Sequence, residues 1–134
     1  MNSKTNKKCR ILLAEDDKDM REMLARALRR AGYDVEECSD GMKLLDHLAA
    51  GLFLNDTDEV YDLIISDICM PGVSGMEVLE DLYKLQKMPP TILITAFGDE
   101  LTHLQAELYG ALIIDKPFNV DALIATACEI IPPA

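Results

Sequence analysis

Four short apolar runs in this chain each lead directly to a polar side chain with distinctive chemistry. The runs span residues 11–14, 63–66, 92–94 and 112–115, and the side chains at their ends are Glu15 and Asp16, Asp67, Thr95, and Lys116. If the runs are buried parallel strands, their carboxyl ends converge on one edge of a sheet, where open α/β sheets bind ligands and react. Unit charges about 4 Å apart interact at roughly 4 kcal/mol for an effective dielectric near 20, so three neighbouring carboxylates require positive charge at this edge.

The length and composition are those of one globular domain. At 134 residues, the chain is long enough to bury about two-thirds of the surface that its unfolded form exposes. With 49% hydrophobic and 28% charged residues, it differs from intrinsically disordered proteins. The 24 acidic and 13 basic residues give a net charge of -11, which repels nucleic acid and anionic lipid and argues against direct DNA binding.

The cysteines and the hydropathy pattern indicate a cytoplasmic protein. No Cys-x-x-Cys pair and no histidine cluster completes a zinc site, so free thiols are expected at all the cysteines, which are Cys9, Cys38, Cys69 and Cys128. The apolar run over residues 11–14 is too short for the core of a signal peptide. No run reaches the roughly 18 apolar residues that a membrane-spanning helix needs, so we expect no contact with a membrane.

Segments with helical period separate the apolar runs, which is the pattern of a parallel sheet covered by helices on both faces. We expect helices over residues 20–31, 40–51, 76–85, 99–110 and 119–131, and a second, weaker strand over 33–38. Asp40 and Asn119 are placed to cap their helices, and Gly51 is placed to end the second one. Five βα units result.

Two segments carry specific structural expectations. Residues 51–60 combine an apolar stretch with an acidic turn, so we expect an extended loop there. The helix over 99–110 has only a thin apolar stripe to bury, formed by Leu101, Leu104 and Leu108. This helix should therefore be the most weakly held one, and weakly packed elements are natural candidates for the part of a protein that moves.

The ordered set of Glu15-Asp16, Asp67, Thr95 and Lys116-Pro117-Phe118 resembles the receiver domain of bacterial two-component response regulators. The resemblance covers the chain from about Cys9 to Ile131. It implies a flavodoxin-like, doubly wound α/β fold with a five-stranded parallel sheet of strand order 2-1-3-4-5 and five helices. In this interpretation the receiver domain occupies residues 9–134 and follows a disordered amino-terminal tail over residues 1–8.

The resemblance also implies a role for each acidic position. Asp67 matches the phosphoacceptor, which takes a phosphoryl group from a phosphohistidine. Asp16 and Asp67 match direct Mg²⁺ ligands, Glu15 matches an acidic position that acts through water, and Cys69 would contribute its backbone carbonyl. Hard oxygen ligands that hold a partly hydrated Mg²⁺ are consistent with this chemistry, and a phosphoryl transition state spreads charge over oxygens that Mg²⁺ and a lysine can stabilise.

The remaining positions match the switch of the family. Lys116 matches the cation of the site, Thr95 matches the hydroxyl that moves toward the phosphoryl group, and the Lys116–Pro117 bond matches one that is often cis in the family. Phosphorylation would then alter the 95–110 region. One departure concerns Ile113, which stands where many receivers have a Tyr or Phe, so the usual aromatic readout lacks its ring here.

The implied partner is a sensor histidine kinase or a phosphotransfer protein. The chain would catalyse only transfer to, and hydrolysis from, its own Asp67, so it is expected to be a signalling switch and not an enzyme. Output would come from a further domain or a separate protein. The sequence leaves open a homodimer formed through the helix over 99–110.

Three other functions are consistent with parts of the pattern. A phosphatase of the haloacid-dehalogenase type also uses Mg²⁺ and an aspartate, but it needs a second Asp where this chain has Cys69. A flavodoxin has a neutral phosphate loop after its first strand, whereas Glu15-Asp16-Asp17 would repel phosphate. A receiver that is never phosphorylated and only docks partners would not need the complete set of site residues.

Several polar residues have simpler interpretations. Asp17 is expected at a helix start, where negative charge is favourable. His47 and His103 are expected as surface histidines on helices, and Asp115 as an acid at a strand end. Met70 is expected to fill a gap or anchor a turn.

Overall fold

The computed structural model describes residues 8–86, 88–96 and 98–133, so the predicted disordered tail falls outside the described residues except for Lys8. Five parallel strands form one sheet in the order β2-β1-β3-β4-β5, which confirms the predicted doubly wound fold. The strands are β1 (Arg10–Ala14), β2 (Asp34–Cys38), β3 (Leu63–Asp67), β4 (Thr91–Thr95) and β5 (Leu112–Asp115).

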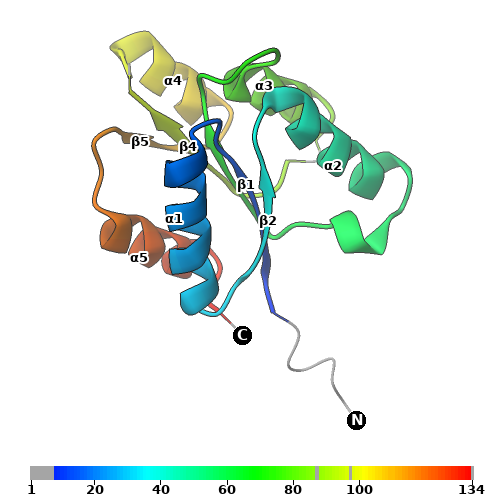
Figure 1. Cartoon of the computed structure of the whole chain (residues 1–134). Coiled ribbons are helices and arrows are strands. Elements are labelled where there is room, and N and C mark those ends of the chain that lie inside the picture. Colours follow the sequence, from blue (N-terminus) through cyan, green and yellow to red (C-terminus); the bar gives the residue numbers. More distant parts are fainter. Residues whose placement is uncertain (1–7, 87, 97, 134) are drawn as a thin grey trace.

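Helices cover both faces of this sheet (Figure 1). They are α1 (Lys18–Arg30), α2 (Gly41–Phe53), α3 (Gly75–Lys84), α4 (Glu100–Leu108) and α5 (Val120–Ile130), with a short 3₁₀ turn, η2, at Thr57–Glu59. Core residues of α1 and α5 pack together on one face, whereas those of α2, α3 and α4 pack on the other. Among the described residues, no helix is both long enough and apolar enough to span a bilayer.

The central strands are continuous apolar runs because both of their faces are buried. Successive side chains point to opposite faces, so Ile11 and Leu13 join the core under α1 and α5, while Leu12 joins the core under α2 and α3. Each fully buried aliphatic side chain of this kind contributes about 1.5–3 kcal/mol. The two layers therefore hold the strand ends, and the polar residues that follow them, in place.

Side-chain caps begin the helices where the sequence predicts. Asp40 accepts a hydrogen bond from the Lys43 amide, and Asn119 accepts one from the Ala122 amide. Asp17 accepts a hydrogen bond from the Met20 amide at 3.1 Å, which confirms its interpretation as a helix start. Met70 is buried at 8% exposure, which confirms it as a packing residue.

The second helix and the segment after it differ from the sequence prediction. Gly51 lies inside α2, not at its end, and the predicted extended loop instead contains the last turn of α2 and the turn η2. A Cβ at Gly51 would lie 2.0 Å from the Glu59 carbonyl oxygen. The glycine is thus explained by the close approach of two backbone segments, which spacing along the chain does not reveal.

His47, which the sequence predicts as a surface histidine, is instead partly buried and paired with Glu59. Its Nδ1 lies 2.7 Å from Oε2 of Glu59, and its side chain is 25% exposed. The hydroxyl of Tyr61 donates to the same carboxylate. Burial works against the charge on Glu59, but the hydrogen bonds from Tyr61 and His47 outweigh it and lower the pKa of this carboxyl group.

The predicted buried stripe of α4 is also wrong. Leu101, Leu104 and Leu108 are 64%, 56% and 65% exposed. Of the α4 residues, all of which the structure describes, Ala106 alone is buried. A small side chain at the contact lets the helix lie close to the sheet, and the leucines then face outward. The expectation that α4 is weakly held agrees with this packing.

Candidate functional site

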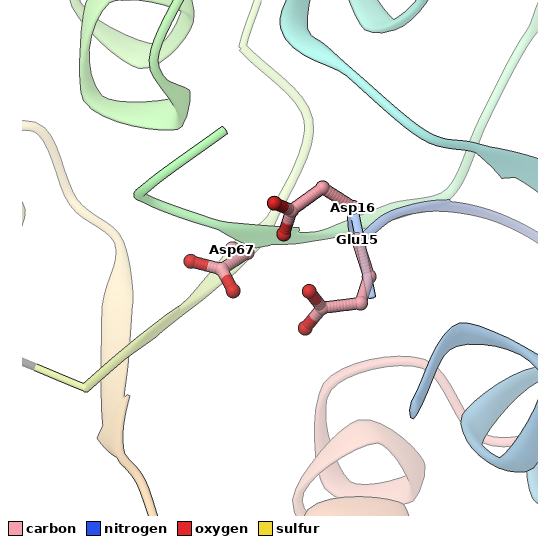
Figure 2. Close-up of side chains that lie close together, drawn as sticks. All are labelled: Glu15, Asp16 and Asp67. Carbon is pink, nitrogen blue, oxygen red and sulfur yellow. The ribbon is translucent and has the colours of Figure 1, made fainter. Parts of the chain in front are cut away.

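Three carboxyl groups gather beyond the ends of β1 and β3 (Figure 2). Ala14 pairs with Ser66 in the parallel ladder, so the chain leaves β1 through Glu15 beside Asp67 at the end of β3. One carboxylate oxygen from each of Glu15, Asp16 and Asp67 lies within 4.8 Å of the others. Glu15 and Asp67 are buried, whereas Asp16 is exposed to solvent. This arrangement brings the sequence-predicted acidic residues together.

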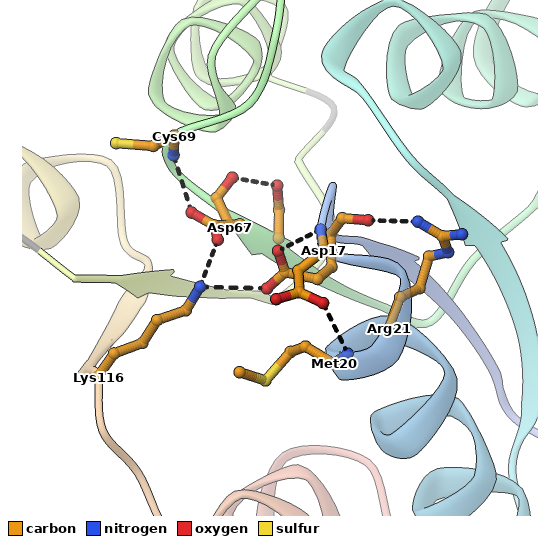
Figure 3. Close-up of polar contacts among 8 residues, drawn as sticks. Asp17, Met20, Arg21, Asp67, Cys69 and Lys116 are labelled. Atoms are coloured by element: carbon orange, nitrogen blue, oxygen red, sulfur yellow. Dashed lines mark hydrogen bonds and ion pairs between the residues drawn. The ribbon is translucent and has the colours of Figure 1, made fainter.

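Lys116 supplies positive charge at this edge. Its Nζ lies 2.6 Å from Oδ2 of Asp67 and 3.3 Å from Oε1 of Glu15, as the dashed lines from Lys116 in Figure 3 show. The peptide bond between Lys116 and Pro117 is cis, as predicted. The lysine thereby bridges the ends of β1 and β3 from β5, on the far side of β4.

The buried charges at this edge perturb one another. Burial, with a smaller contribution from the charge of Asp67, raises the pKa of Glu15 to about 7. Burial works against the ammonium of Lys116, but the hydrogen bond and the charge of Asp67 outweigh it, so the pKa of Lys116 is raised. The lysine is therefore held in its charged form.

Both carboxylate oxygens of Asp67 have defined partners. Oδ2 accepts from Lys116, and Oδ1 accepts a hydrogen bond from the backbone amide of Cys69 at 2.9 Å (Figure 3). The neighbouring Ser66 hydroxyl donates to the Asp67 carbonyl at 2.9 Å. These contacts fix the orientation of the carboxylate. Cys69 is exposed beside it and contacts Asp67 through its amide, and the part predicted for its carbonyl stays a prediction.

Thr95 ends β4 at the same edge of the sheet. Asp67 pairs with Ile94, so Thr95 lies one residue beyond the register position of Asp67. Thr95 is 1% exposed, and its carbonyl accepts a hydrogen bond from the Lys116 amide at 2.7 Å. The sequence-predicted hydroxyl and ammonium thus lie on adjacent strand ends. Ile113 is half-buried and packs with the core under α4.

The donor set fits a hard divalent cation. Three carboxylates face one ammonium in the described part of this edge, so negative charge remains in excess when all of them are ionised. Two of these carboxylates are buried, where uncompensated charge is most unfavourable. Carboxylate oxygens of this kind are the ligands that Mg²⁺ takes, with water and phosphate oxygens completing its shell.

Sequence reasoning missed two sets of polar contacts near the site. Nη1 of Arg21 donates to the Glu15 carbonyl at 2.8 Å, which ties the start of α1 to the acidic loop (Figure 3). His103, predicted as a surface histidine, is 39% exposed, and its pairing with Asp115 at 3.2 Å was not predicted. The signal for the first pair was the position of Arg21 one helical turn after the cap at Asp17. The second pair joins distant residues and had no signal in the sequence.

Comparisons with known proteins agree with this geometry. The family model for the response regulator receiver domain matches residues 11–127. The chain is 32% identical over 117 residues to the transcriptional regulatory protein CpxR homolog of Haemophilus influenzae, covering 87% of this chain and 47% of that protein. It is 37% identical over 117 residues to the transcriptional activator protein PfeR of Pseudomonas aeruginosa, covering 87% of this chain and 35% of that protein. The chain therefore spans less than half the length of these two relatives.

Solved structures share the fold. The chemotaxis protein CheY4 of Vibrio cholerae superposes with a TM-score of 0.75 at 26% identity, covering 92% of this chain and 98% of that one. The receiver domain of the Francisella response regulator 1452 gives a TM-score of 0.79 at 26% identity, covering 91% and 95%. With the family model matching most of its length, this chain belongs to the response regulator receiver domain family.

Proposed function

We propose that this chain is a phosphoacceptor switch of a two-component system, with Asp67 as the residue that is phosphorylated. The observation that carries the proposal is the buried Asp67 carboxylate, held 2.6 Å from Lys116 and beside two further carboxyl groups. An aspartate so oriented can act as a nucleophile once the charge of its target is neutralised. The family membership supports a regulatory role for the domain, and its place in a two-component system supports a cytoplasmic location.

The reaction is transfer of a phosphoryl group from a phosphohistidine. A carboxylate oxygen of Asp67 attacks phosphorus, the P–N bond breaks, and the imidazole leaves with the electron pair of that bond and takes up a proton. The product is an acyl phosphate on Asp67. Lys116 already contacts Oδ2, and from there its ammonium stabilises the charge that spreads over the phosphoryl oxygens in the transition state. Hydrolysis of the acyl phosphate by water would return Asp67 to its starting form.

Mg²⁺ is the cofactor that this donor set fits. Asp16, Asp67 and the backbone carbonyl of Cys69 would hold it directly, and Glu15 would act through a water molecule. When bound, the ion neutralises charge between the carboxylates and the phosphoryl oxygens. Glu15 also accepts a hydrogen bond from the Asp17 amide at 3.1 Å, which keeps its carboxyl group turned into the site.

Thr95 and the segment that follows it would carry the response. The Thr95 hydroxyl would donate to a phosphoryl oxygen, and the backbone after β4 would follow it and reposition α4. Because α4 buries only Ala106 among its residues, all of them described, it is the helix that a gain in binding energy at Asp67 would move most readily. Ile113 cannot offer the hydroxyl or the ring swing of the aromatic residue common in the family.

The partner that phosphorylates Asp67 is proposed to be a sensor histidine kinase or a phosphotransfer protein. It must approach the edge that holds Lys116, where a hollow of about 420 Å³ is lined largely by apolar side chains, among them Met20, Met23 and Phe118. The exposed leucines of α4 form a second apolar face. This second face is where a homodimer or an output domain would bind.

The test is phosphorylation of the purified protein by acetyl phosphate with Mg²⁺, followed by intact-protein mass spectrometry. We expect the wild-type protein to gain one phosphoryl group and Asp67→Asn to gain none. The control variant Asp46→Asn, which changes an exposed carboxylate on α2, should gain one phosphoryl group as the wild-type protein does. A cognate histidine kinase is the stricter donor. An unphosphorylated wild-type protein with that kinase, or modification that survives in Asp67→Asn, would refute the proposal. Steady turnover of p-nitrophenyl phosphate would instead indicate a phosphatase.

A further inference from the structure

Two consecutive residues at the end of β5 contact different parts of the molecule. Lys116 reaches the acidic site, with Nζ 2.6 Å from Oδ2 of Asp67. Asp115 reaches α4, where its Oδ1 lies 3.2 Å from Nε2 of His103. Nε2 can donate this hydrogen bond in the neutral ring or in the protonated one. The end of β5 therefore connects the candidate phosphorylation site with the helix expected to move.

The backbone between β4 and α4 passes directly over this pair. A Cβ at Gly98 would lie 2.1 Å from Oδ1 of Asp115, 3.0 Å from Nε2 of His103 and 2.9 Å from Cγ2 of Thr95. A side chain at this position would displace the ends of the Asp115 and His103 side chains. A displacement of Thr95 and of the backbone that follows it must therefore disturb the contact between His103 and Asp115.

Ala106 packs in the core with Leu79 and Leu93, and the Tyr109 hydroxyl, just after α4, donates to Glu80 of α3 at 3.4 Å. The other main contact of α4 is with β5, and the leucines of α4 are exposed. The cap at Asp99 bonds to the Thr102 amide, which lies within the same helix, so it does not tie α4 to the sheet. Among the described residues, the contact between His103 and Asp115 is therefore one of the few that fix the helix against β5.

We propose that His103 and Asp115 form a latch that holds α4 against β5 in the unphosphorylated protein and opens when Asp67 is phosphorylated. This inference rests on the proposed function. On phosphorylation Lys116 exchanges its contact with Oδ2 of Asp67 for phosphoryl oxygens, and Thr95 moves toward the same group. Both changes displace groups that adjoin the latch. His103 and Asp115 are positioning residues, since neither touches the acidic site in the structure.

The latch is a polar contact between β5 and α4. It lies near Ile113, which stands at the position where many receivers have an aromatic residue. Ile113 lies two residues before Asp115 on the same strand and lacks a polar group. A contact made in only one of two states shifts the equilibrium toward that state, and its removal favours the other state by the same factor. Loss of the latch should therefore make the phosphorylated arrangement easier to reach.

The first experiment measures the affinity for beryllofluoride in the presence of Mg²⁺ by fluorine NMR and calorimetry. The pair is partly exposed, at 39% for His103 and 55% for Asp115, so we expect His103→Leu and Asp115→Ala each to raise the affinity by about 1.5- to fivefold. The double variant should bind no more tightly than the tighter single variant, because both changes break one contact. Unchanged or weakened binding in His103→Leu, or additive effects in the double variant, would overturn the latch.

Two further variants separate the latch from a general loss of packing. His103→Gln keeps an N–H donor and should restore affinity toward the wild-type value. His47→Gln alters another histidine–carboxylate pair, in which Nδ1 of His47 lies 2.7 Å from Oε2 of Glu59. This pair is distant from β5 in the fold, so the variant should leave the affinity for beryllofluoride unchanged. If His47→Gln raises the affinity as much as His103→Leu does, the effect is not specific to the latch and the proposal fails.

Hydrogen exchange tests the latch in the unphosphorylated protein, whatever the outcome with beryllofluoride. We expect the amides of residues 100–110 to exchange about 1.5- to fivefold faster in His103→Leu than in the wild-type protein, with β1 and β3 unaffected. Equal exchange rates in α4 would overturn the latch even if Asp67 is phosphorylated normally. A wild-type protein that neither binds beryllofluoride nor accepts a phosphoryl group would overturn the proposed function, and with it the opening of the latch on phosphorylation.

Discussion

Replacing Lys116 with methionine should destabilise the protein, because it leaves two buried carboxyl groups without their cation. At an effective dielectric of about 20, an ammonium 2.6 Å from Asp67 and 3.3 Å from Glu15 is attracted by roughly 6 and 5 kcal/mol. Desolvation of all three groups offsets most of this attraction. Removing one partner of a buried pair costs about 3–5 kcal/mol, and since the lysine side chain is 22% exposed, we expect about 3 kcal/mol for Lys116→Met.

The free energy of unfolding is to be measured by urea denaturation at pH 8 without divalent cations. The control is Lys84→Met, which removes the ion pair between Lys84 and Glu80. These side chains are 67% and 40% exposed, so solvent screens the pair and its loss should change the stability far less than the loss of Lys116 does. Adding Asp67→Asn to Lys116→Met removes one of the two uncompensated carboxylates and should recover about half of the loss.

Two outcomes would contradict this electrostatic argument. If Lys116→Met costs no more than Lys84→Met, the lysine does not compensate the buried carboxyl groups. If Asp67→Asn lowers the stability of Lys116→Met further, then the loss comes from packing of the lysine stem and not from charge.

Three other predictions concern Mg²⁺ binding, the packing of two glycines and the reactivity of the cysteines. Mg²⁺ should raise the thermal unfolding midpoint of the wild-type protein but not that of Asp16→Asn, as measured by calorimetry with and without a chelator. The reason is that an ion that binds the folded state and not the unfolded state stabilises the folded state. Gly51→Ala should lower the free energy of unfolding, measured by urea denaturation, by about 2–3 kcal/mol, because its Cβ would meet a backbone oxygen at 2.0 Å. Gly110→Ala should lower it by only about 1 kcal/mol, because this residue has open space around it and only the backbone strain at φ +78° remains. The exposed Cys69 should react first with a thiol reagent at pH 8, and Cys38 last, because burial raises the pKa of Cys38 to about 12; mass spectrometry of timed samples checks the order.

Much of the fold was predictable because strands and helices leave periodic patterns. The run over residues 63–66 is apolar throughout, which is the pattern of a strand covered on both faces, and β3 is such a strand. The meeting of Asp67 with Lys116 was also predictable, because parallel strands bring their carboxyl ends to one edge. The roles of these residues in phosphoryl transfer stay predictions until the variants are measured.

The errors share one physical origin. Periodicity shows that α4 has an apolar stripe, but not whether another element covers that stripe, and Leu104 proved to be exposed. Gly51 carries the signal of a helix end, yet its small size serves a close approach to the carbonyl of Glu59. In both cases the outcome depends on how another segment packs against the residue, which the local pattern does not show.

The sequence by itself determined the class of fold, the strands, and the set of polar residues at the carboxyl edge of the sheet, because each of these follows from the local pattern and from the geometry of parallel strands. Only the tertiary structure decided which surface of α4 is buried and which distant side chains pair, as His103 does with Asp115. Such pairs depend on the distance and angle at which helices pack on the sheet, and these are set by all the side chains between them.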